Sequence, residues 1–352
     1  MKLESLLKEA SLRKATDLHI SCGLPPQIRR DGQLEPLAEQ YLSSTKIEEL
    51  LRPVIPKRAW QELTEHGEAD FSWGLPGVGR FRVNVFKQRD SLSLAIRLIP
   101  HEIPTLGELG MPEAVGELAT KKRGLVLVTG PTGSGKSTTL AALVDKINRE
   151  RSCHILTLED PIEYLHCHQR SMVNQREIGS DTKSFAPALR AALRQDPDVI
   201  LVGEMRDLET IATAITAAET GHLVLATLHT ADAPGAVERI IDVFPPHQQQ
   251  QVRVQLATNL EAVVAQQLLP KNGGGLVAAV EVLMATSAVR NLIREGKNHQ
   301  LPMAIQTGAA VGMQTMDNAL KSLYRQGAIS FENALTYAAV PGELKRLLAG
   351  GE

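Results

Sequence analysis

A chain of 352 residues exceeds the usual size of one domain, so two domains are the default expectation. Hydrophobic residues make up 43% and charged residues 22% of the sequence, which excludes a disordered chain and allows extensive cores. The formal net charge is -2, without the basic excess that DNA and RNA translocases usually carry, so we expect no nucleic-acid partner.

Changes in the pattern of apolar, proline and glycine residues along the chain predict its division into domains. Residues 1–99 mix short helices and strands, which predicts a small α+β domain. Prolines and glycines gather in the next stretch, and we read residues 100–116 as an interdomain linker. Residues 117–285 form the predicted core domain, and residues 286–352 are expected to be a helical C-terminal region.

One hairpin of the N-terminal domain has an informative register. Alternating apolar residues predict two strands in residues 80–98, joined by a two-residue turn at Arg89 and Asp90. This register places Arg82 opposite Arg97 on the polar face of the hairpin. Like charges that face each other directly are unfavourable, so we expect an anion between or beside these two arginines.

In the core domain, short aliphatic runs alternate with helical stretches. We expect strands at residues 125–128, 155–158, 199–202 and 223–226. Strands that alternate with helices predict a largely parallel sheet covered by helices on both faces. The fold class is therefore α/β.

The strongest motif is the phosphate-loop pattern GxxxxGK[ST], which begins directly after the first of these strands. Its glycines let backbone N–H groups surround phosphate oxygens, and the following helix N-terminus attracts negative charge. Lys136 should reach the β- and γ-phosphates, and Ser137 should bind Mg²⁺. The expected nucleotide-binding residues are Gly130, Pro131, Thr132, Gly133, Ser134, Gly135, Lys136, Ser137 and Thr138.

Acidic residues end two of the other strands. The strand in residues 198–204 ends in Glu204, at the edge where α/β proteins bind ligands, and this carboxylate could hold Mg²⁺ directly or through water. Glu159, Asp160 and Glu163 follow another strand, and one of them is the natural general base for hydrolysis. A structural role remains the alternative for each acid.

Two histidines flank the strand in residues 220–230. His222 and His229 are seven residues apart, too far along one strand to share a metal ion, so no zinc site is expected. A histidine beside a strand is more often structural. His229, at the C-terminal end, is the better candidate for contact with the γ-phosphate.

The cysteines and the apolar runs indicate the compartment. Cys22, Cys153 and Cys167 form no CxxC pair, which favours reduced thiols. The apolar runs are far shorter than the roughly 20 residues that cross a bilayer, and the charged N-terminus is unlike a signal peptide. We expect a cytoplasmic protein without a membrane span.

In type and order, these motifs resemble the secretion-ATPase superfamily, whose members power type II secretion, type IV pili and type IV secretion. Its aspartate box is similar to residues 155–163, its glutamate-ended Walker B motif to residues 198–204, and its histidine box to residues 220–230. The resemblance covers nearly the whole chain. It implies a RecA-like phosphate-loop ATPase domain with a smaller N-terminal α+β (PAS-like) domain and a helical C-terminal region.

Within the superfamily, the chain is most similar to the twitching-motility branch, which retracts type IV pili. Residues 288–300 resemble the AIRNLIRE signature of that branch, with Val289 in place of isoleucine. Taken alone, this segment would read as an amphipathic surface helix. Extension and secretion members usually carry a long N-terminal docking region and a tetracysteine zinc site, neither of which is evident here.

The resemblance also implies roles for individual residues. Glu163 would activate water, Glu204 would hold the water shell of Mg²⁺, and His229 would respond to the γ-phosphate. Arg82 and Arg97 match arginines that approach the γ-phosphate, although pattern alone would leave them as solvated side chains. The weaker candidates are Arg190, Arg194 and Arg206.

Finally, the resemblance implies a homohexamer that binds ATP and Mg²⁺ between its two domains and drives pilus retraction by interdomain rotation. The implied partner is the inner-membrane pilus platform protein, where the motor would be peripheral, and a paralogous ATPase could join it. The alternatives are a retraction accessory paralogue, a pilus-extension or type II secretion ATPase, a nucleotide-gated scaffold without hydrolysis, and a nucleic-acid translocase. ATP rather than GTP follows from the resemblance alone.

Overall fold

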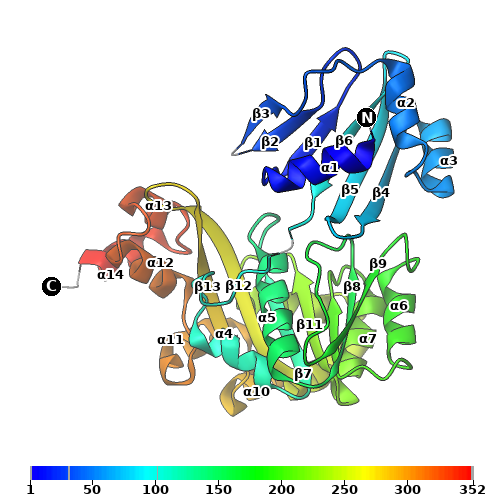
Figure 1. The fold of residues 1–352 in the computed structure, drawn as a ribbon. Helices are drawn as coiled ribbons and strands as arrows, with labels where there is room; N and C mark the ends of the chain where they lie inside the picture. Colours follow the sequence, from blue (N-terminus) through cyan, green and yellow to red (C-terminus); the bar gives the residue numbers. More distant parts are fainter. Residues whose placement is uncertain (1, 31, 101, 350–352) are drawn as a thin grey trace. The chain divides into compact units, whose positions relative to one another are not determined.

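The computed structural model describes residues 2–30, 32–100 and 102–349, and the parts of the predicted domains and linker at residues 1, 31, 101 and 350–352 lie outside the described residues. Internal contacts divide the chain into two units (Figure 1). The first unit is Met1–Glu102 with Glu163–Leu165, and the second is Ile103–Ile162 with His166–Glu352. The boundaries at residues 99, 116 and 285 stay a prediction.

The first unit is built on a six-stranded antiparallel sheet with the strand order β3-β2-β1-β6-β5-β4. Three helices cover one face of this sheet, and their apolar sides pack on it to form the core of the unit. The elements are α1 (Leu3–Leu12), β1 (Asp17–Ile20), β2 (Gln27–Arg30), β3 (Gln33–Pro36), α2 (Ser44–Leu51), α3 (Lys57–His66), β4 (Glu68–Leu75), β5 (Gly79–Gln88) and β6 (Ser91–Leu98).

The predicted register of the β5–β6 hairpin is confirmed. Val83 pairs with Ile96, and both are fully buried in the core of this unit. Arg89 and Asp90 form the two-residue turn with φ angles of 45° and 59°, the left-handed conformation that a tight hairpin turn requires. Arg82 therefore does lie opposite its predicted partner on the polar face.

The second unit contains a seven-stranded sheet with the strand order β13-β12-β7-β11-β10-β8-β9, in which only β13 is antiparallel to its neighbour. The four predicted strands are confirmed as β7, β8, β10 and β11, whereas the other three were not predicted. The strands are β7 (Gly124–Thr129), β8 (His154–Glu159), β9 (Met172–Glu177), β10 (Val199–Val202), β11 (Leu223–Leu228), β12 (Leu260–Pro270) and β13 (Leu276–Met284).

Helices cover both faces of this sheet, as predicted, and each face has its own apolar core. On one face, Leu140, Leu143 and Ile147 of α5 pack on the strands. The helices of the two faces are α4 (Glu113–Glu117) and α5 (Lys136–Glu150) on one side, and α6 (Phe185–Ala192), α7 (Leu208–Glu219), α8 (Ala233–Asp242), α9 (Pro246–Asn259), α10 (Ser287–Arg294) and α11 (Leu301–Thr307) on the other.

Most of the segment predicted as a linker belongs to the second unit. Ile103, Leu106, Leu109 and Met111 pack against the core on the α5 face. A reciprocal turn fixes this segment, because the carboxylate of Glu108 accepts hydrogen bonds from the backbone N–H and the hydroxyl of Thr105 at 2.7 and 2.8 Å. The segment from residue 103 onward is therefore ordered by the second unit.

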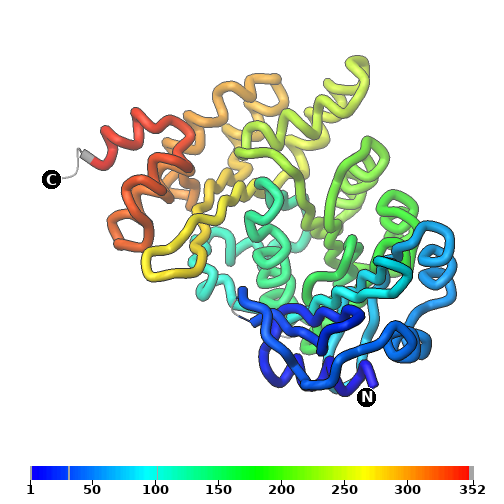
Figure 2. The backbone as a smooth tube through the Cα atoms, turned by 90° about the horizontal axis from the view of Figure 1, so that it is seen from above, coloured from blue at the N-terminus to red at the C-terminus, as the bar shows by residue number. Residues whose placement is uncertain are grey.

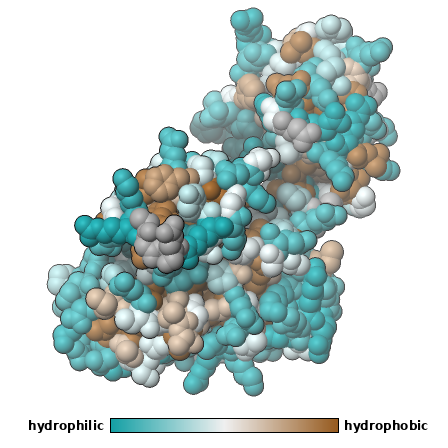
Figure 3. All heavy atoms as spheres, turned by 90° about the vertical axis from the view of Figure 1, so that its left-hand side faces the viewer, coloured by the Kyte–Doolittle hydropathy of each residue, from teal (hydrophilic) through white to brown (hydrophobic). Residues whose placement is uncertain are grey.

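The C-terminal region is helical, as predicted. Helices α12 (Met316–Arg325), α13 (Phe331–Thr336) and α14 (Pro341–Ala349) lie beside the β12–β13 hairpin (Figure 2) and share a small apolar core with it. On the side of the molecule that Figure 3 shows, apolar side chains occur in small groups among hydrophilic ones. Among the described residues, we find no helix with the length and apolarity that a bilayer crossing requires.

Candidate nucleotide site

The predicted nucleotide motifs of the second unit meet at one edge of its sheet. Strands β7, β10 and β11 are parallel neighbours, so their C-terminal ends lie together. The phosphate loop follows β7, Glu204 follows β10 and His229 follows β11. This is the edge at which parallel α/β sheets bind ligands.

The phosphate loop depends on glycine where the backbone passes close to β12. Gly130 has a φ of +144°, and a Cβ atom there would lie 2.2 Å from the carbonyl oxygen of Gln266. Gly135, the N-cap of α5, has a φ of +85°, and a Cβ atom would lie 2.7 Å from the side-chain nitrogen of Gln266. The other end of the same amide accepts a hydrogen bond from the Thr139 hydroxyl at 2.8 Å. Gln266 therefore buttresses the loop.

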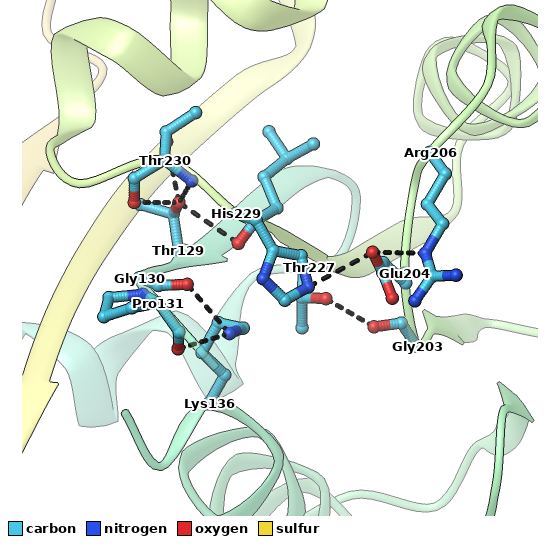
Figure 4. A network of polar contacts seen from close by, with 11 residues as sticks. Thr129, Gly130, Pro131, Lys136, Gly203, Glu204, Arg206, Thr227, His229 and Thr230 are labelled. Atoms are coloured by element: carbon cyan, nitrogen blue, oxygen red, sulfur yellow. Dashed lines mark hydrogen bonds and ion pairs between the residues drawn. The ribbon is translucent and has the colours of Figure 1, made fainter. Parts of the chain in front are cut away.

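The ammonium group of Lys136 is turned back onto the loop (Figure 4). Its Nζ donates to the carbonyl oxygens of Gly130 and Pro131 at 2.9 and 3.0 Å. Burial lowers the pKa of Lys136, and the charge of Glu204 opposes this effect. A lysine held by two carbonyls can exchange them for phosphate oxygens, which are stronger, charged acceptors.

One polar atom of the loop stands apart. The hydroxyl of Ser134 is buried, and it makes no hydrogen bond within the described part of the chain. Buried polar groups are normally satisfied, so an isolated one indicates a missing partner such as a ligand. Ser137, in contrast, is exposed at the first turn of α5.

Glu204 lies between two basic side chains (Figure 4). Its Oε1 is 2.5 Å from Nε of Arg206 and 3.1 Å from Nε2 of His229. Partial burial by itself raises the pKa of Glu204, but Arg206 and His229 outweigh it and hold the pKa below its usual value. The carboxylate is therefore charged at neutral pH. The structure brings Glu204 and His229 together.

The phosphate loop and the His229 segment are joined by two threonines. The Thr129 hydroxyl lies 2.7 Å from the Thr230 hydroxyl and accepts a hydrogen bond from the Thr230 backbone N–H at 2.9 Å. Thr129 is the last residue of β7, directly before Gly130. The residue after His229 is thus hydrogen-bonded to the residue before the phosphate loop.

The acids that follow β8 have different surroundings. The Glu159 carboxylate accepts hydrogen bonds from Thr157 at 2.6 Å and Gln175 at 3.0 Å. Asp160 and Glu163 are exposed. Glu163 is grouped with the first unit, as are Arg82 and Arg97. The phosphate loop, Glu204 and His229 all belong to the second unit.

The arginine candidates also differ in their partners. Nε of Arg97 is 3.0 Å from the carboxylate of Asp17, which lies opposite it on β1. Among the weaker candidates, Arg190 pairs with Glu209, and the Arg194 side chain donates to the Arg190 carbonyl oxygen at 3.3 Å. Of these weaker candidates, only Arg206 contacts a predicted catalytic residue.

A cavity of about 640 Å³ adjoins the phosphate loop at Gly135 and Thr138. Its walls come from residues 107–112, from the β12–β13 hairpin and from α12. All of these elements belong to the second unit. The cavity has the size of a small-ligand site and is lined by both apolar and polar groups.

The donors at the site fit a magnesium ion. Mg²⁺ prefers oxygen ligands, commonly one or two carboxylates with phosphate oxygens and water. The exposed hydroxyl of Ser137 and the charged carboxylate of Glu204 supply such oxygens at the edge of the sheet that carries the phosphate loop.

Sequence reasoning missed several residues of this site. Gln266, the Thr129–Thr230 pair and the cavity walls had no predicted role. A polar residue within the long apolar stretch of β12 is a signal that could have indicated Gln266. The threonine pair spans 101 residues of sequence, so its contact depends on the register of β7 and β11.

Comparisons with known proteins agree with these motifs. A family model described as "Type II/IV secretion system protein" matches residues 3–273. The chain is 50% identical to the type IV pilus retraction ATPase PilT of Pseudomonas aeruginosa, over 97% of this chain and 99% of PilT. The type IV pilus ATPase PilU of the same organism is 44% identical, over 100% of this chain and 92% of PilU.

Solved structures give the same result. A crystal structure of the pilus retraction motor PilT with bound ADP matches with a TM-score of 0.91 at 51% identity, over 98% of this chain and 99% of that one. An X-ray structure of the ATPase DotB from Legionella pneumophila matches with a TM-score of 0.82 at 29% identity, over 99% of this chain and 96% of that one. The chain belongs to the type II/IV secretion system protein family.

Proposed function

We propose that this chain is an ATPase motor that powers type IV pilus retraction. The observation that carries the proposal is a complete phosphate loop at the same sheet edge as Glu204 and His229. The chain that contains this site is 50% identical to PilT over nearly its whole length. ATP hydrolysis would supply the work, and pilus disassembly with twitching motility would be the outcome.

In the second unit, each group has a defined part. The loop N–H groups and Lys136 would hold the triphosphate, with the lysine exchanging its two carbonyl contacts for phosphate oxygens. Ser137 and Glu204 would hold Mg²⁺, directly or through water, and the bound ion would neutralise phosphate charge. His229 would respond to the γ-phosphate through its contact with Glu204. The cavity beside Gly135 would take the base and the ribose.

Glu163 is the proposed general base. Its exposed carboxylate follows β8, and Glu177 supports the same loop by accepting a hydrogen bond from the Ile162 N–H at 3.1 Å. Glu163→Gln should lower kcat for ATP by about 10²- to 10⁴-fold, with ATP binding retained. Glu238→Gln, which changes an exposed carboxylate on α8, is the matched control and should leave kcat unchanged. Full activity in Glu163→Gln would show that another group acts as the base.

Arg82 and Arg97 are proposed to stabilise negative charge on the γ-phosphate during its transfer. Their support is the register of β5 and β6, which places two exposed arginines opposite each other on one face of the sheet. An arginine in this role contributes up to about 10³- to 10⁵-fold to kcat. Arg82→Gln should therefore reduce kcat strongly, and Arg30→Gln, in the same sheet, should not.

The assembly and the partners belong to the same proposal. We expect a homohexamer whose nucleotide-driven movements act on the inner-membrane pilus platform protein from the cytoplasmic side. Measuring the mass of the purified protein with and without nucleotide tests the hexamer, and a monomer under all conditions would contradict it.

The decisive experiment is a deletion of the gene, followed by a pilus count and a twitching assay. Abundant pili without twitching, restored by the wild-type gene and not by Lys136→Ala, would support a retraction motor. Cells without pili would instead identify an extension motor.

A retraction accessory protein is the second candidate, because the chain is also 44% identical over its whole length to a second type IV pilus ATPase, PilU. The two candidates differ in what the chain can do without a paralogue. If this chain restores twitching in a strain that lacks every paralogous retraction ATPase, it is the motor. If it restores twitching only beside a paralogue, it is the accessory protein.

A further inference from the structure

The carboxylate of Glu281 joins the first residues of two helices that come from different parts of the chain. It lies on β13 opposite Ala265. Its Oε1 accepts a hydrogen bond from the backbone N–H of Ala233 at 2.8 Å, and the backbone N–H of Met316 also favours its charged form. Ala233 begins α8, and Met316 begins α12. The first N–H groups of a helix lack partners within the helix, and a negative charge there is stabilising.

The α8 side of this contact leads to the nucleotide site. Asp232 caps α8 by accepting a hydrogen bond from the Gly235 N–H at 2.7 Å. His229 and Thr230 come just before it, and Thr230 is bonded to Thr129 at the start of the phosphate loop. The position of the first turn of α8 therefore depends on the segment that contacts Glu204 and the phosphate loop.

The α12 side leads to the wall of the cavity. Gln314, two residues before α12, exchanges backbone hydrogen bonds with Val282 at 2.9 and 3.2 Å. Its side chain donates to the Val280 carbonyl oxygen at 2.7 Å. Ala319 and Leu323 of α12 line the cavity beside the phosphate loop. Glu281 thus lies between the His229 segment and one wall of this cavity.

A carboxylate at this place is costly, which argues that its acceptor atoms are needed. Burial raises the pKa of Glu281, and the nearby charges of Asp232 and Asp317 raise it further. The two backbone N–H groups act in the opposite direction. A neutral side chain would avoid the repulsion but would lose a charged acceptor that serves two helices.

We propose that Glu281 is a positioning residue that couples the His229–Asp232 segment to α12. A movement of this segment on loss of the γ-phosphate then reaches the helical C-terminal region through one shared carboxylate. This inference rests on the proposed nucleotide-dependent function. The C-terminal helices would respond to the nucleotide through this contact.

The test is hydrogen–deuterium exchange of the full chain, alone, with Mg²⁺ and ADP, and with Mg²⁺ and a non-hydrolysable ATP analogue. In the wild type, amides of residues 316–325 should exchange differently with the two nucleotides. Glu281→Ala should abolish this difference while residues 130–138 still respond to both. Glu281→Gln, which keeps an acceptor but removes the charge, should reduce the difference, since charge-assisted hydrogen bonds are the stronger ones.

Asp317→Asn is the matched control. Asp317 is a buried carboxylate in the first turn of α12 that accepts a hydrogen bond from the Ala339 N–H at 3.2 Å, and Ala339 lies between α13 and α14. This variant should keep the nucleotide-dependent difference at residues 316–325. A merely structural role for Glu281 predicts the same general loosening in both variants.

The outcomes separate the coupling from the function on which it rests. If residues 130–138 do not respond to nucleotide in the wild type, the proposed function itself fails. If they respond but residues 316–325 never do, or respond equally in Glu281→Ala, the coupling is refuted. If Glu281→Ala does not fold, Glu281→Gln decides the question, and an unreduced difference would overturn the proposal.

Discussion

His166 gives the second unit a pH dependence that can be calculated. Its backbone N–H donates to the side-chain oxygen of Gln175 at 2.8 Å, and its Nδ1 is buried without a hydrogen-bond partner among the residues that the structure describes. Burial lowers the pKa of His166 to about 4 from the usual 6.5, although the charge of Asp145 opposes the shift. The folded protein therefore holds this ring neutral under conditions in which an unfolded chain would protonate it.

The sign follows from the two pKa values of His166. Above pH 6.5 the ring is neutral in both states, so its contribution to stability is complete. As the pH falls from 6.5 towards about 4, the unfolded chain binds a proton that the folded chain does not, and stability is lost. The pKa difference corresponds to a total loss of about 3 kcal/mol, of which about 2 kcal/mol has occurred at pH 5.

Urea unfolding at pH 7 and pH 5, followed by circular dichroism, measures this loss. The free energy of unfolding of the wild type should fall between the two pH values by about 2 kcal/mol more than that of His166→Gln. The matched control is His247→Gln, which removes an exposed histidine and should keep the wild-type pH dependence. If wild type and His166→Gln lose the same free energy, the ring is accessible to protons in the folded state and the reasoning is wrong.

Two further predictions concern the phosphate loop and α10. Gly130→Ala places a Cβ atom 2.2 Å from a backbone oxygen, so it should lower the free energy of unfolding by about 1–3 kcal/mol and abolish ATP binding in calorimetry. Gly273→Ala, also at positive φ but with open space around it, should leave ATP binding intact. Arg290→Met removes hydrogen bonds to two carbonyl oxygens at the end of α9, which should cost about 1–3 kcal/mol for each buried group left unsatisfied. Arg294→Met, an exposed change on the same helix, should stay within about 0.5 kcal/mol of the wild type in urea unfolding.

The parts of the fold that the sequence predicted have a strong local pattern. The β5–β6 hairpin combines alternating apolar residues with a two-residue turn, so its register was determined by residues close in sequence. The four predicted strands of the second unit are short, mostly aliphatic runs, typical of strands buried on both faces. The phosphate loop was recognisable because its glycines and lysine have fixed spacing.

The parts that the sequence did not predict depend on contacts between distant segments. The β12–β13 hairpin was missed because Gln266 and Gln267 interrupt its apolar pattern, and the structure shows that Gln266 is buried against the phosphate loop. The prolines and glycines of the segment from residue 103 predicted a linker. In the structure, however, its apolar side chains pack on the core of the second unit. The roles assigned to Glu163, Glu204 and His229 stay predictions, since geometry supports them without testing them.

The two facing arginines show how far a register argument extends. The pairing of Arg82 with Arg97 required a nearby anion, and the structure provides one within the sheet, because Asp17 lies opposite Arg97 and contacts it. The Asp17 carboxylate therefore supplies part of the negative charge that the two arginines need. The register by itself does not predict a bound phosphate. The Arg97 side chain of this ion pair is largely exposed to solvent. The pair therefore contributes no more than about 1 kcal/mol to stability. A contact this weak can be exchanged for a phosphate at little cost. The role proposed for Arg97 is thus compatible with its ion pair, in which Asp17 orients the arginine.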